Sequence, residues 1–157
     1  MAEANPLEAR RKKLERRYLE PTTTDAAPLG TGGVDHLALI SSDLDATIRF
    51  YTEILGMRLA KVVPNRDEPT STHIFLDMGG GNMLAFFDFP EKSSSPTVRG
   101  IGSMHHVALK ATVAQYQALL ARLGERKIAY SLHGDEEKGS VYLRDPDNIL
   151  VEVTTGY

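Results

Sequence analysis

Two short stretches of the chain are near copies of each other. DHLALI occupies residues 35–40 and HHVALK residues 105–110, so a histidine precedes the same kind of apolar run twice, 70 residues apart. Such self-similarity indicates an internal repeat, and a repeat constrains the fold more strongly than composition does. The flanking patterns recur in the same order, which predicts a strand, a helix and three more strands in each half.

The two repeats run over residues 34–89 and 104–155, and a linker at 90–103 joins them. Alternation of apolar residues predicts the strands, and apolar residues at helical spacing followed by glycine predict the helices. The elements expected are strands at 34–40, 57–63, 72–78 and 82–89 around a helix at 44–55, and strands at 104–110, 127–132, 140–144 and 149–154 around a helix at 113–123.

The first 33 residues differ in composition from the rest of the chain. Good helix formers fill residues 7–20, and the Pro-, Thr- and Gly-containing segment 21–33 is typical of a linker. Residues 1–20 carry six Arg/Lys and four Glu, which leaves 12 basic and 17 acidic groups, or −5, in the remainder. We expect a basic arm that docks on its own body, docks on a neighbouring subunit, or stays a solvated helix.

The overall composition excludes several classes of protein. The chain has 157 residues, enough for a single domain with a real core, and no cysteine, which rules out disulfides and thiolate zinc sites. The charged N-terminus is unlike a secretory signal, and no apolar run approaches the roughly 20 residues that span a bilayer. A net charge of −3 gives no support for nucleic-acid binding. We therefore expect a cytoplasmic protein with neither a membrane nor a nucleic acid as partner.

Strand alternation places the repeated histidines on equivalent faces. His36 shares a face with Ala38, and His106 shares a face with Ala108, opposite the Leu and Val side chains that would seat each repeat's helix. Both histidines should therefore lie on the concave side of the sheet. By the same alternation His105 is expected on the helix side, as a hydrogen-bonded or partly exposed side chain.

The last predicted strand, ILVEVTT, contains a lone carboxylate, Glu152. Burying an unpaired carboxylate is costly, but a neighbouring cation would compensate for it. The bland alternative is an edge strand on which Glu152 faces water. Two histidines at matched repeat positions and one inward carboxylate together favour a shared metal held by His36, His106 and Glu152.

These motifs resemble the vicinal oxygen chelate superfamily, which includes glyoxalase I, bleomycin-resistance proteins and type I extradiol dioxygenases. The resemblance covers about residues 34–155 and rests on VDHLAL, HHVAL and YLRDPDNILVE. It implies an α+β fold of two βαβββ modules that form a cupped mixed sheet. It also implies that His36, His106 and Glu152 occupy the superfamily's ligand positions.

The resemblance also bears on the metal. In glyoxalase I-like members a further Glu or Gln ligand comes from the fourth strand of the first repeat, and the matching position here is about Ala85. Alanine cannot bind a metal, so three protein ligands remain. Two histidines and one carboxylate are typical of non-haem Fe(II) oxygenases, with room for a diol and O₂. We expect Fe(II), with Mn(II), Zn(II) or Ni(II) as alternatives.

A second motif resembles the C-terminal signature of extradiol dioxygenases. His133, Tyr142 and Glu152 match its spacing, while Asn148 replaces a glycine. The resemblance implies that His133 and Tyr142 are catalytic residues that hydrogen-bond the substrate or oxygen intermediates. Residues 90–102 contain no counterpart of the family's acid–base histidine.

The leading interpretation is an extradiol-type oxygenase that acts on a small aromatic or vicinal-diol substrate with O₂, as a homodimer. One alternative uses the same triad without redox chemistry, as a glyoxalase-like isomerase or lyase or a fosfomycin-resistance-type enzyme. An alternative of another class is a metal-free protein that binds a drug.

Overall fold

The computed structural model describes residues 6–19, 31–91, 94–95 and 97–156. The chain divides into two compact units, Met1–Gly33 and Val34–Tyr157. In the first unit α1 (Pro6–Tyr18) is a helix whose apolar side chains, including Leu14 and Tyr18, are exposed. No helix in the described ranges is long and apolar enough to cross a membrane.

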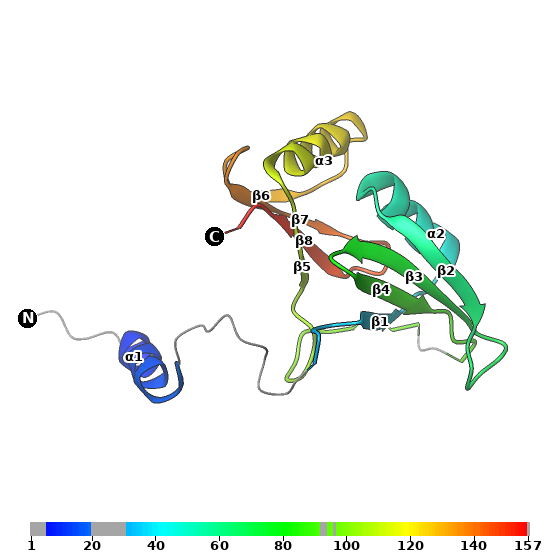
Figure 1. The fold of residues 1–157 in the computed structure, drawn as a ribbon, viewed down its shortest axis with the longest axis horizontal. Helices are drawn as coiled ribbons and strands as arrows, with labels where there is room; N and C mark the ends of the chain where they lie inside the picture. Colours follow the sequence, from blue (N-terminus) through cyan, green and yellow to red (C-terminus); the bar gives the residue numbers. More distant parts are fainter. Residues whose placement is uncertain (1–5, 20–30, 92–93, 96, 157) are drawn as a thin grey trace, which may run out of the picture. The chain divides into compact units, whose positions relative to one another are not determined.

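The second unit contains two modules with the same order of elements (Figure 1). The first module consists of β1 (His36–Ile40), α2 (Leu44–Arg49), η1 (Phe50–Ile54), β2 (Arg58–Pro64), β3 (Thr72–Gly79) and β4 (Asn82–Phe87). The second consists of β5 (Val107–Lys110), α3 (Val113–Glu125), β6 (Ser131–Gly134), β7 (Gly139–Arg144) and β8 (Leu150–Thr154).

Each module forms its own four-stranded mixed sheet. The strand orders are β1-β4-β3-β2 and β5-β8-β7-β6, with the first strand parallel to its neighbour and the other pairs antiparallel. The two sheets have the same strand order when each strand of the first module is matched with the corresponding strand of the second. The expected α+β fold of two βαβββ modules is therefore confirmed.

The helix expected at residues 44–55 changes type midway. Asp43 caps α2 by accepting the backbone N–H groups of Asp45 and Ala46, and the chain then continues as the π-helix η1. Its wider turn is closed by the Leu55 N–H, which donates to the Phe50 carbonyl. Helical periodicity predicted the element but not this change.

The first antiparallel strand of the second module starts later than expected. The prediction was a strand at 127–132 after a helix ended by Gly124, but α3 continues to Glu125 and β6 begins at Ser131. Lys127 has a φ of +54°, so it makes the left-handed turn that was assigned to Gly124. The segment between the two elements is consequently not a strand.

A single core joins the helix-bearing sides of both modules. Leu37, Leu39, Val107 and Leu109 of the first strands all pack against it. Its fully or largely buried members come from both sheets, η1 and α3: Tyr51, Ile54, Ile74, Leu76, Leu84, Phe86, Tyr116, Leu119, Leu123, Val141, Leu143, Val151 and Val153.

Polar contacts also cross between the modules on this side. Arg122 of α3 donates to the Ile54 carbonyl at 2.6 Å, and the Tyr51 hydroxyl donates to Asp145 at 3.2 Å. The alternation of each strand then turns the opposite face of its sheet, the one with the histidine, away from the shared core. The two histidine-bearing faces are thus separate surfaces of the chain.

Candidate metal centre

The second sheet brings His106 and Glu152 together. Glu152 lies in the centre of β8, paired in register with Ala108 and Tyr142, and its side chain is fully buried. The His106 Nε2 is 2.9 Å from the Glu152 Oε2. Because a carboxylate and an imidazole are both good ligands for divalent transition metals, this pair fits two positions of the expected metal site.

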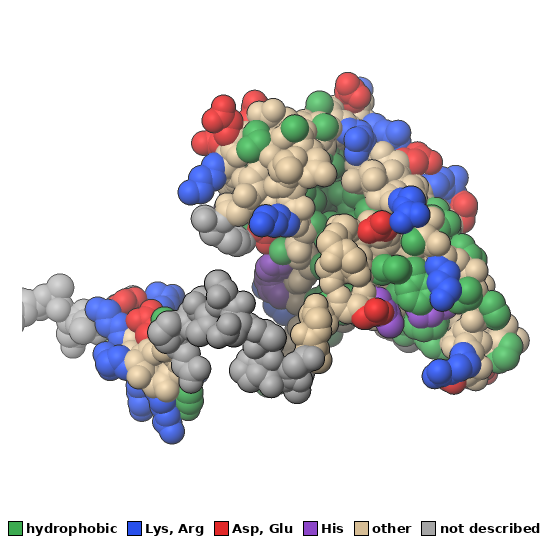
Figure 2. All heavy atoms as spheres, in the orientation of Figure 1, with side chains coloured by type: hydrophobic (Ala, Val, Ile, Leu, Met, Phe, Trp, Pro, Cys, Tyr) green, Lys and Arg blue, Asp and Glu red, His purple; other side chains and the backbone are tan. Residues whose placement is uncertain are grey.

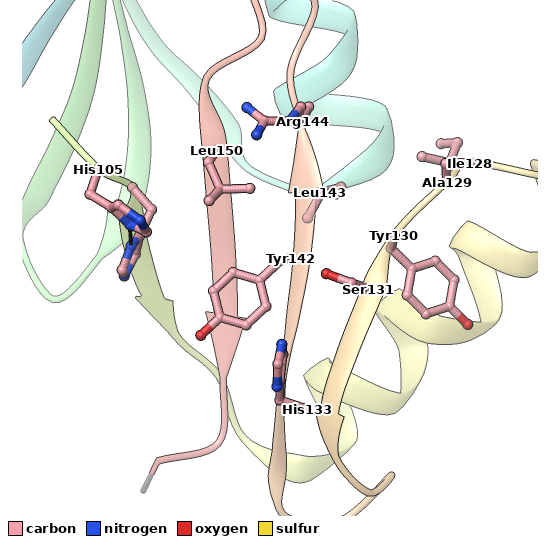
Figure 3. Close-up of a pocket in the computed structure, with 11 residues that line it drawn as sticks. His105, Ile128, Ala129, Tyr130, Ser131, His133, Tyr142, Leu143, Arg144 and Leu150 are labelled. Atoms are coloured by element: carbon pink, nitrogen blue, oxygen red, sulfur yellow. Dashed lines mark hydrogen bonds between the residues drawn. The ribbon is translucent and has the colours of Figure 1, made fainter. Parts of the chain in front are cut away.

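Tyr142 and His133 lie on the same face of that sheet. The Tyr142 ring centroid is 6.0 Å from that of His106 and 5.3 Å from that of His133. Figure 3 shows Tyr142 on β7 with His133 beside it on β6. All three rings line a pocket of about 790 Å³, together with Ile128, Ala129, Tyr130, Ser131, Leu143, Arg144, Leu150 and His105.

His105 does not occupy the helix side of the sheet, where the alternation placed it. It lines the same pocket, and its Nδ1 is 2.6 Å from the Nδ1 of His106 (Figure 3). The reason is that β5 begins only at Val107, so residues before it do not follow strand alternation. As expected, His105 is hydrogen-bonded and exposed.

His36 lies on the open face of the first sheet, among aromatic rings. Its Nδ1 is 2.6 Å from the Asp35 Oδ1, and its ring centroid is 5.5 Å from Phe75 and 6.1 Å from His73. The His73 ring stacks on the Phe87 ring, with 3.7 Å between the two ring centroids. Burial lowers the pKa of His73, and His36 and Lys61 lower it further.

The structure does not bring all three predicted ligands together in one chain. No group of three His, Asp or Glu side chains within the described ranges is arranged to hold a metal ion. The histidine side chains in Figure 2 accordingly form two separate groups. The ligand set is split, with His36 on the first module and His106 and Glu152 on the second.

Ala85 lies on the open face of the first sheet, beside Phe75 and Ala38, and is fully buried. It has no donor atom, as the sequence indicated.

Three polar residues near the predicted ligands were not among the predicted site residues: Asp35, His73 and His105. For Asp35 and His105 a signal was present, since each immediately precedes one of the two repeated histidines. Nothing in the local pattern distinguishes His73 from a structural strand residue.

Comparison with known proteins assigns the chain to a family. A model of the Glyoxalase/Bleomycin resistance protein/Dioxygenase superfamily matches residues 33–153, which contain every predicted site residue and both modules except the last residue of β8. The chain belongs to this superfamily. Its repeat, sheet order and paired His106 and Glu152 are therefore features of a superfamily member.

Curated relatives have several activities. The 3-methylcatechol 2,3-dioxygenase of Pseudomonas putida is 30% identical over 149 residues, which cover 90% of this chain and 48% of that enzyme. Mouse mitochondrial methylmalonyl-CoA epimerase is 28% identical over 134 residues, covering 78% of this chain and 72% of the epimerase. The chain spans only 25% and 38% of two further relatives, MhqA and MhqE of Bacillus subtilis.

Solved structures share the fold. A glyoxalase/bleomycin resistance protein/dioxygenase domain from Frankia superposes with a TM-score of 0.68 at 22% identity, covering 81% of this chain and 99% of that domain. The fosfomycin resistance protein FosX of Listeria monocytogenes, in complex with Mn(II) and 1S,2S-dihydroxypropylphosphonic acid, superposes with a TM-score of 0.61 at 20% identity. The match covers 81% of this chain and 94% of that protein. The curated matches include a dioxygenase and an epimerase, so they do not select one reaction, and the solved structures show the fold.

Proposed function

We propose that the protein is a divalent-metal-dependent enzyme that cleaves the ring of a catechol-type diol with O₂, in the manner of type I extradiol dioxygenases. The observation that carries the proposal is the open face of the second sheet. There His106, Glu152, Tyr142 and His133 lie together, with the His106–Glu152 contact at 2.9 Å and the Tyr142 ring beside both histidines.

We infer that the third ligand, His36, reaches the site from a second copy of the chain. Among the residues that the structure describes, β1 pairs only with β4 and β5 only with β8, so both are edge strands. His36 begins β1, and His106 immediately precedes β5. Setting β1 of one copy beside β5 of another would bring the His36 imidazole to the His106–Glu152 pair. A two-fold axis would generate two such sites in a homodimer.

Two imidazoles and a carboxylate form a ligand set used by non-haem Fe(II) oxygenases, so the donors fit Fe(II). Fe(II) bound there would supply the redox centre through which a diol transfers electron density to O₂. In ring cleavage both oxygen atoms enter the product as one ring carbon–carbon bond breaks. The protein's own contribution is to bind, orient and shield the reactants.

The lining of the pocket suits such a substrate. Leu150 and Ile128 provide apolar surface for a ring, while the Tyr142 hydroxyl and the His133 imidazole offer hydrogen bonds to its oxygens.

The dioxygenase relative supports the proposal, because its similarity covers 90% of this chain. This chain nevertheless spans less than half of that enzyme, so its activity and substrate are part of the proposal.

A second candidate is a non-redox reaction on the same ligands, such as isomerisation. The observation that favours it is the epimerase match, because this chain spans 72% of the epimerase and thus resembles it more closely in length. Such chemistry needs an electrophilic metal, for which Mn(II) or Zn(II) would serve.

Oxygen consumption separates the two candidates. The protein would be reconstituted anaerobically with Fe(II), and O₂ uptake would be followed over a panel of catechols. We expect uptake with at least one diol, none for His106→Ala, and unchanged uptake for Glu53→Gln, an exposed carboxylate elsewhere on the chain. An absence of uptake with every diol, together with tight Mn(II) or Zn(II) binding, would favour the non-redox enzyme.

A further inference from the structure

Arg144 is a cation in the pocket of the second sheet that the ring-cleavage proposal does not use. It lies two residues beyond Tyr142 on β7 and lines the same pocket, and Figure 3 shows both side chains extending from β7 toward β8. We propose that Arg144 selects the substrate, and that the substrate is a diol whose ring carries a carboxylate on the side away from the two hydroxyls. The inference rests on the proposed function, because it names the substrate class of the same site.

The register of β7 and β8 fixes the order of side chains along the pocket. On the open face Tyr142 is paired with Glu152, the residue that contacts His106. One step of two residues further along, about 7 Å, Arg144 is paired with Leu150. The pocket thus presents the proposed ligand pair, an apolar side chain and a cation in that order. A ring with two vicinal oxygens at one end and an anionic group at the other end matches this order.

The charge of Arg144 is not neutralised by another side chain. No ion pair within the described ranges involves Arg144. Its Nη1 donates to the Asn148 backbone carbonyl at 2.8 Å, which holds the side chain at the turn before β8. A guanidinium has five N–H donors, so others are left for a ligand. Because Arg144 is exposed, a ligand can reach these donors from solvent.

The two acidic side chains nearest to Arg144 in the sequence interact with other parts of the chain. Asp145 is buried and accepts a hydrogen bond from the Tyr51 hydroxyl of η1. Asp147 accepts the Ser42 backbone N–H at 3.0 Å. Neither carboxylate forms an ion pair with the guanidinium, which therefore remains available to an anionic ligand at this end of the pocket.

The shape of the guanidinium favours a carboxylate over other anionic groups. Its planar fork can donate two parallel hydrogen bonds to the two oxygens of one carboxylate. Leu150, the register partner of Arg144, offers apolar surface to the ring that carries this group. A diol held by its oxygens at one end and by its carboxylate at the other would have its orientation in the site fixed.

The binding of two matched diols to the zinc-loaded protein tests the proposal without turnover, since Zn(II) has no redox chemistry. One diol is 3,4-dihydroxybenzoate, and the other is 4-methylcatechol, which has an uncharged methyl group in the place of the carboxylate. By calorimetry the wild type should bind 3,4-dihydroxybenzoate at least about tenfold more tightly, as expected for hydrogen bonds to a charged group. Equal affinities, or a preference for 4-methylcatechol, would overturn the proposal.

Substitution of Arg144 should remove that preference. Arg144→Gln should lower the affinity for 3,4-dihydroxybenzoate about tenfold and change that for 4-methylcatechol by less than about twofold. The control is Arg66→Gln, which changes the charge equally at an exposed arginine paired with Asp67 and should leave both affinities unchanged. Equal losses of both diols in Arg144→Gln would indicate that Arg144 acts only through the turn at Asn148, and would contradict the proposal.

Arg144→Lys keeps the charge but not the fork. Its preference for 3,4-dihydroxybenzoate should be smaller than that of the wild type but still present. This variant decides the question even if Arg144→Gln does not fold. A preference equal to that of the wild type would contradict a bidentate contact, and no preference at all would contradict recognition by charge.

The position of the carboxylate on the ring provides a further test. In 2,3-dihydroxybenzoate the carboxylate is next to the hydroxyls, so it cannot extend to Arg144 while the hydroxyl oxygens occupy the metal. Arg144→Gln should therefore leave the affinity for 2,3-dihydroxybenzoate unchanged. A loss as large as that for 3,4-dihydroxybenzoate would contradict the order of groups along the pocket.

Benzoate separates this inference from the proposed function, because it has no diol with which to bind a metal. When benzoate is titrated into the metal-free protein, the Nε–H signal of Arg144 in the NMR spectrum should shift, and uncharged benzyl alcohol should not shift it. If the wild type bound no divalent metal or consumed no O₂, the proposed function would fall while this shift would still show the carboxylate site. An Arg144 signal that benzoate leaves unchanged would overturn the inference, whatever the metal measurements show.

Discussion

At the scale of single residues, Glu152 is the feature that most needs a physical explanation. Its carboxylate is fully buried between β5 and β7, where an ionised group is destabilised by several kcal/mol unless hydrogen bonds and a counter-charge compensate. The His106 Nε2 lies 2.9 Å from the Glu152 Oε2, and a divalent cation held by both side chains would supply the counter-charge. A bound metal would therefore compensate for the cost of burying the Glu152 carboxylate, and without one that cost would remain.

Glu152→Gln should weaken metal binding while leaving the fold intact. The amide keeps the shape of the side chain but is a poor ligand and carries no charge, so zinc affinity should drop by about 100-fold or more. The metal-free variant should unfold at the same temperature as the metal-free wild type or higher, because a neutral group is less costly to bury. Metal content equal to that of the wild type would refute the role of Glu152.

Tyr142→Phe should separate catalysis from metal binding. The change removes only the hydroxyl of a ring that lines the pocket, so kcat should fall about 100-fold, the lower range for a positioned proton donor. Metal content should stay at the wild-type level. A variant with full activity would exclude the hydroxyl from the reaction.

Residues inside strands were the predictable part of the site. Glu152 and Tyr142 lie within β8 and β7, where alternation determines the face, and both point to the side expected. His105 precedes its strand, so alternation misplaced it. The separation of His36 from the other two ligands depends on how the modules pack, which no local pattern encodes.

At the scale of elements, the junction between the modules contains a buried carboxyl. Asp145 is 5% exposed, in the turn before β8, and accepts the Tyr51 hydroxyl from η1. Burial raises the pKa of Asp145 to about 6, although the Ile149 backbone N–H and the Tyr51 hydroxyl oppose the increase. The same burial, with the charge of Asp145, raises the pKa of Tyr51.

This raised pKa predicts a pH dependence of stability. The folded state favours protonated Asp145 more than the unfolded state does. The resulting contribution to the free energy of unfolding is fully present below pH about 3.8 and is lost as pH rises through about 6. The shift corresponds to a change of about 3 kcal/mol in the free energy of unfolding. The difference in unfolding free energy between wild type and Asp145→Asn should fall by up to that amount between pH 4 and 7. A difference independent of pH would contradict it.

The β6–β7 hairpin, which carries His133, depends on Gly139. A Cβ at this position would lie 2.6 Å from the backbone oxygens of both His133 and Asp135. Gly139→Ala should therefore shift the hairpin, destabilise the protein by about 1–3 kcal/mol and lower activity. The control is Gly124→Ala, inside α3 with open space around it, which should stabilise by up to about 1 kcal/mol. Melting curves that rank the two variants in the reverse order would contradict this.

The presence of the helices and strands could be predicted from the sequence, whereas the residues at which some of them begin or change type could not. The repeat and its periodicities predicted the helices and strands of both modules in the right order. The π-helical η1 and the late start of β6 were missed. Both depend on backbone conformations, such as the left-handed Lys127, that residue type does not announce.

At the scale of the whole molecule, the chain presents the predicted ligands on two separate surfaces. The helix-bearing sides are used to join the modules, and within the described ranges β1 and β5 each pair with one strand only. Exposed edges invite pairing with another strand. A two-fold dimer would cover both edges and complete two sites at once.

Complementation between two defective chains tests this central claim most directly. His36→Ala and Glu152→Ala each damage both sites of a homodimer, so neither variant alone should bind stoichiometric zinc. When the two are co-expressed, each mixed dimer contains one site with all three ligands, and random pairing should restore about a quarter of the wild-type zinc content. Recovery of zinc binding in the co-expressed pair is the predicted result. A pair that remains as empty as its parents, although mixed dimers form, would contradict a site shared between two copies.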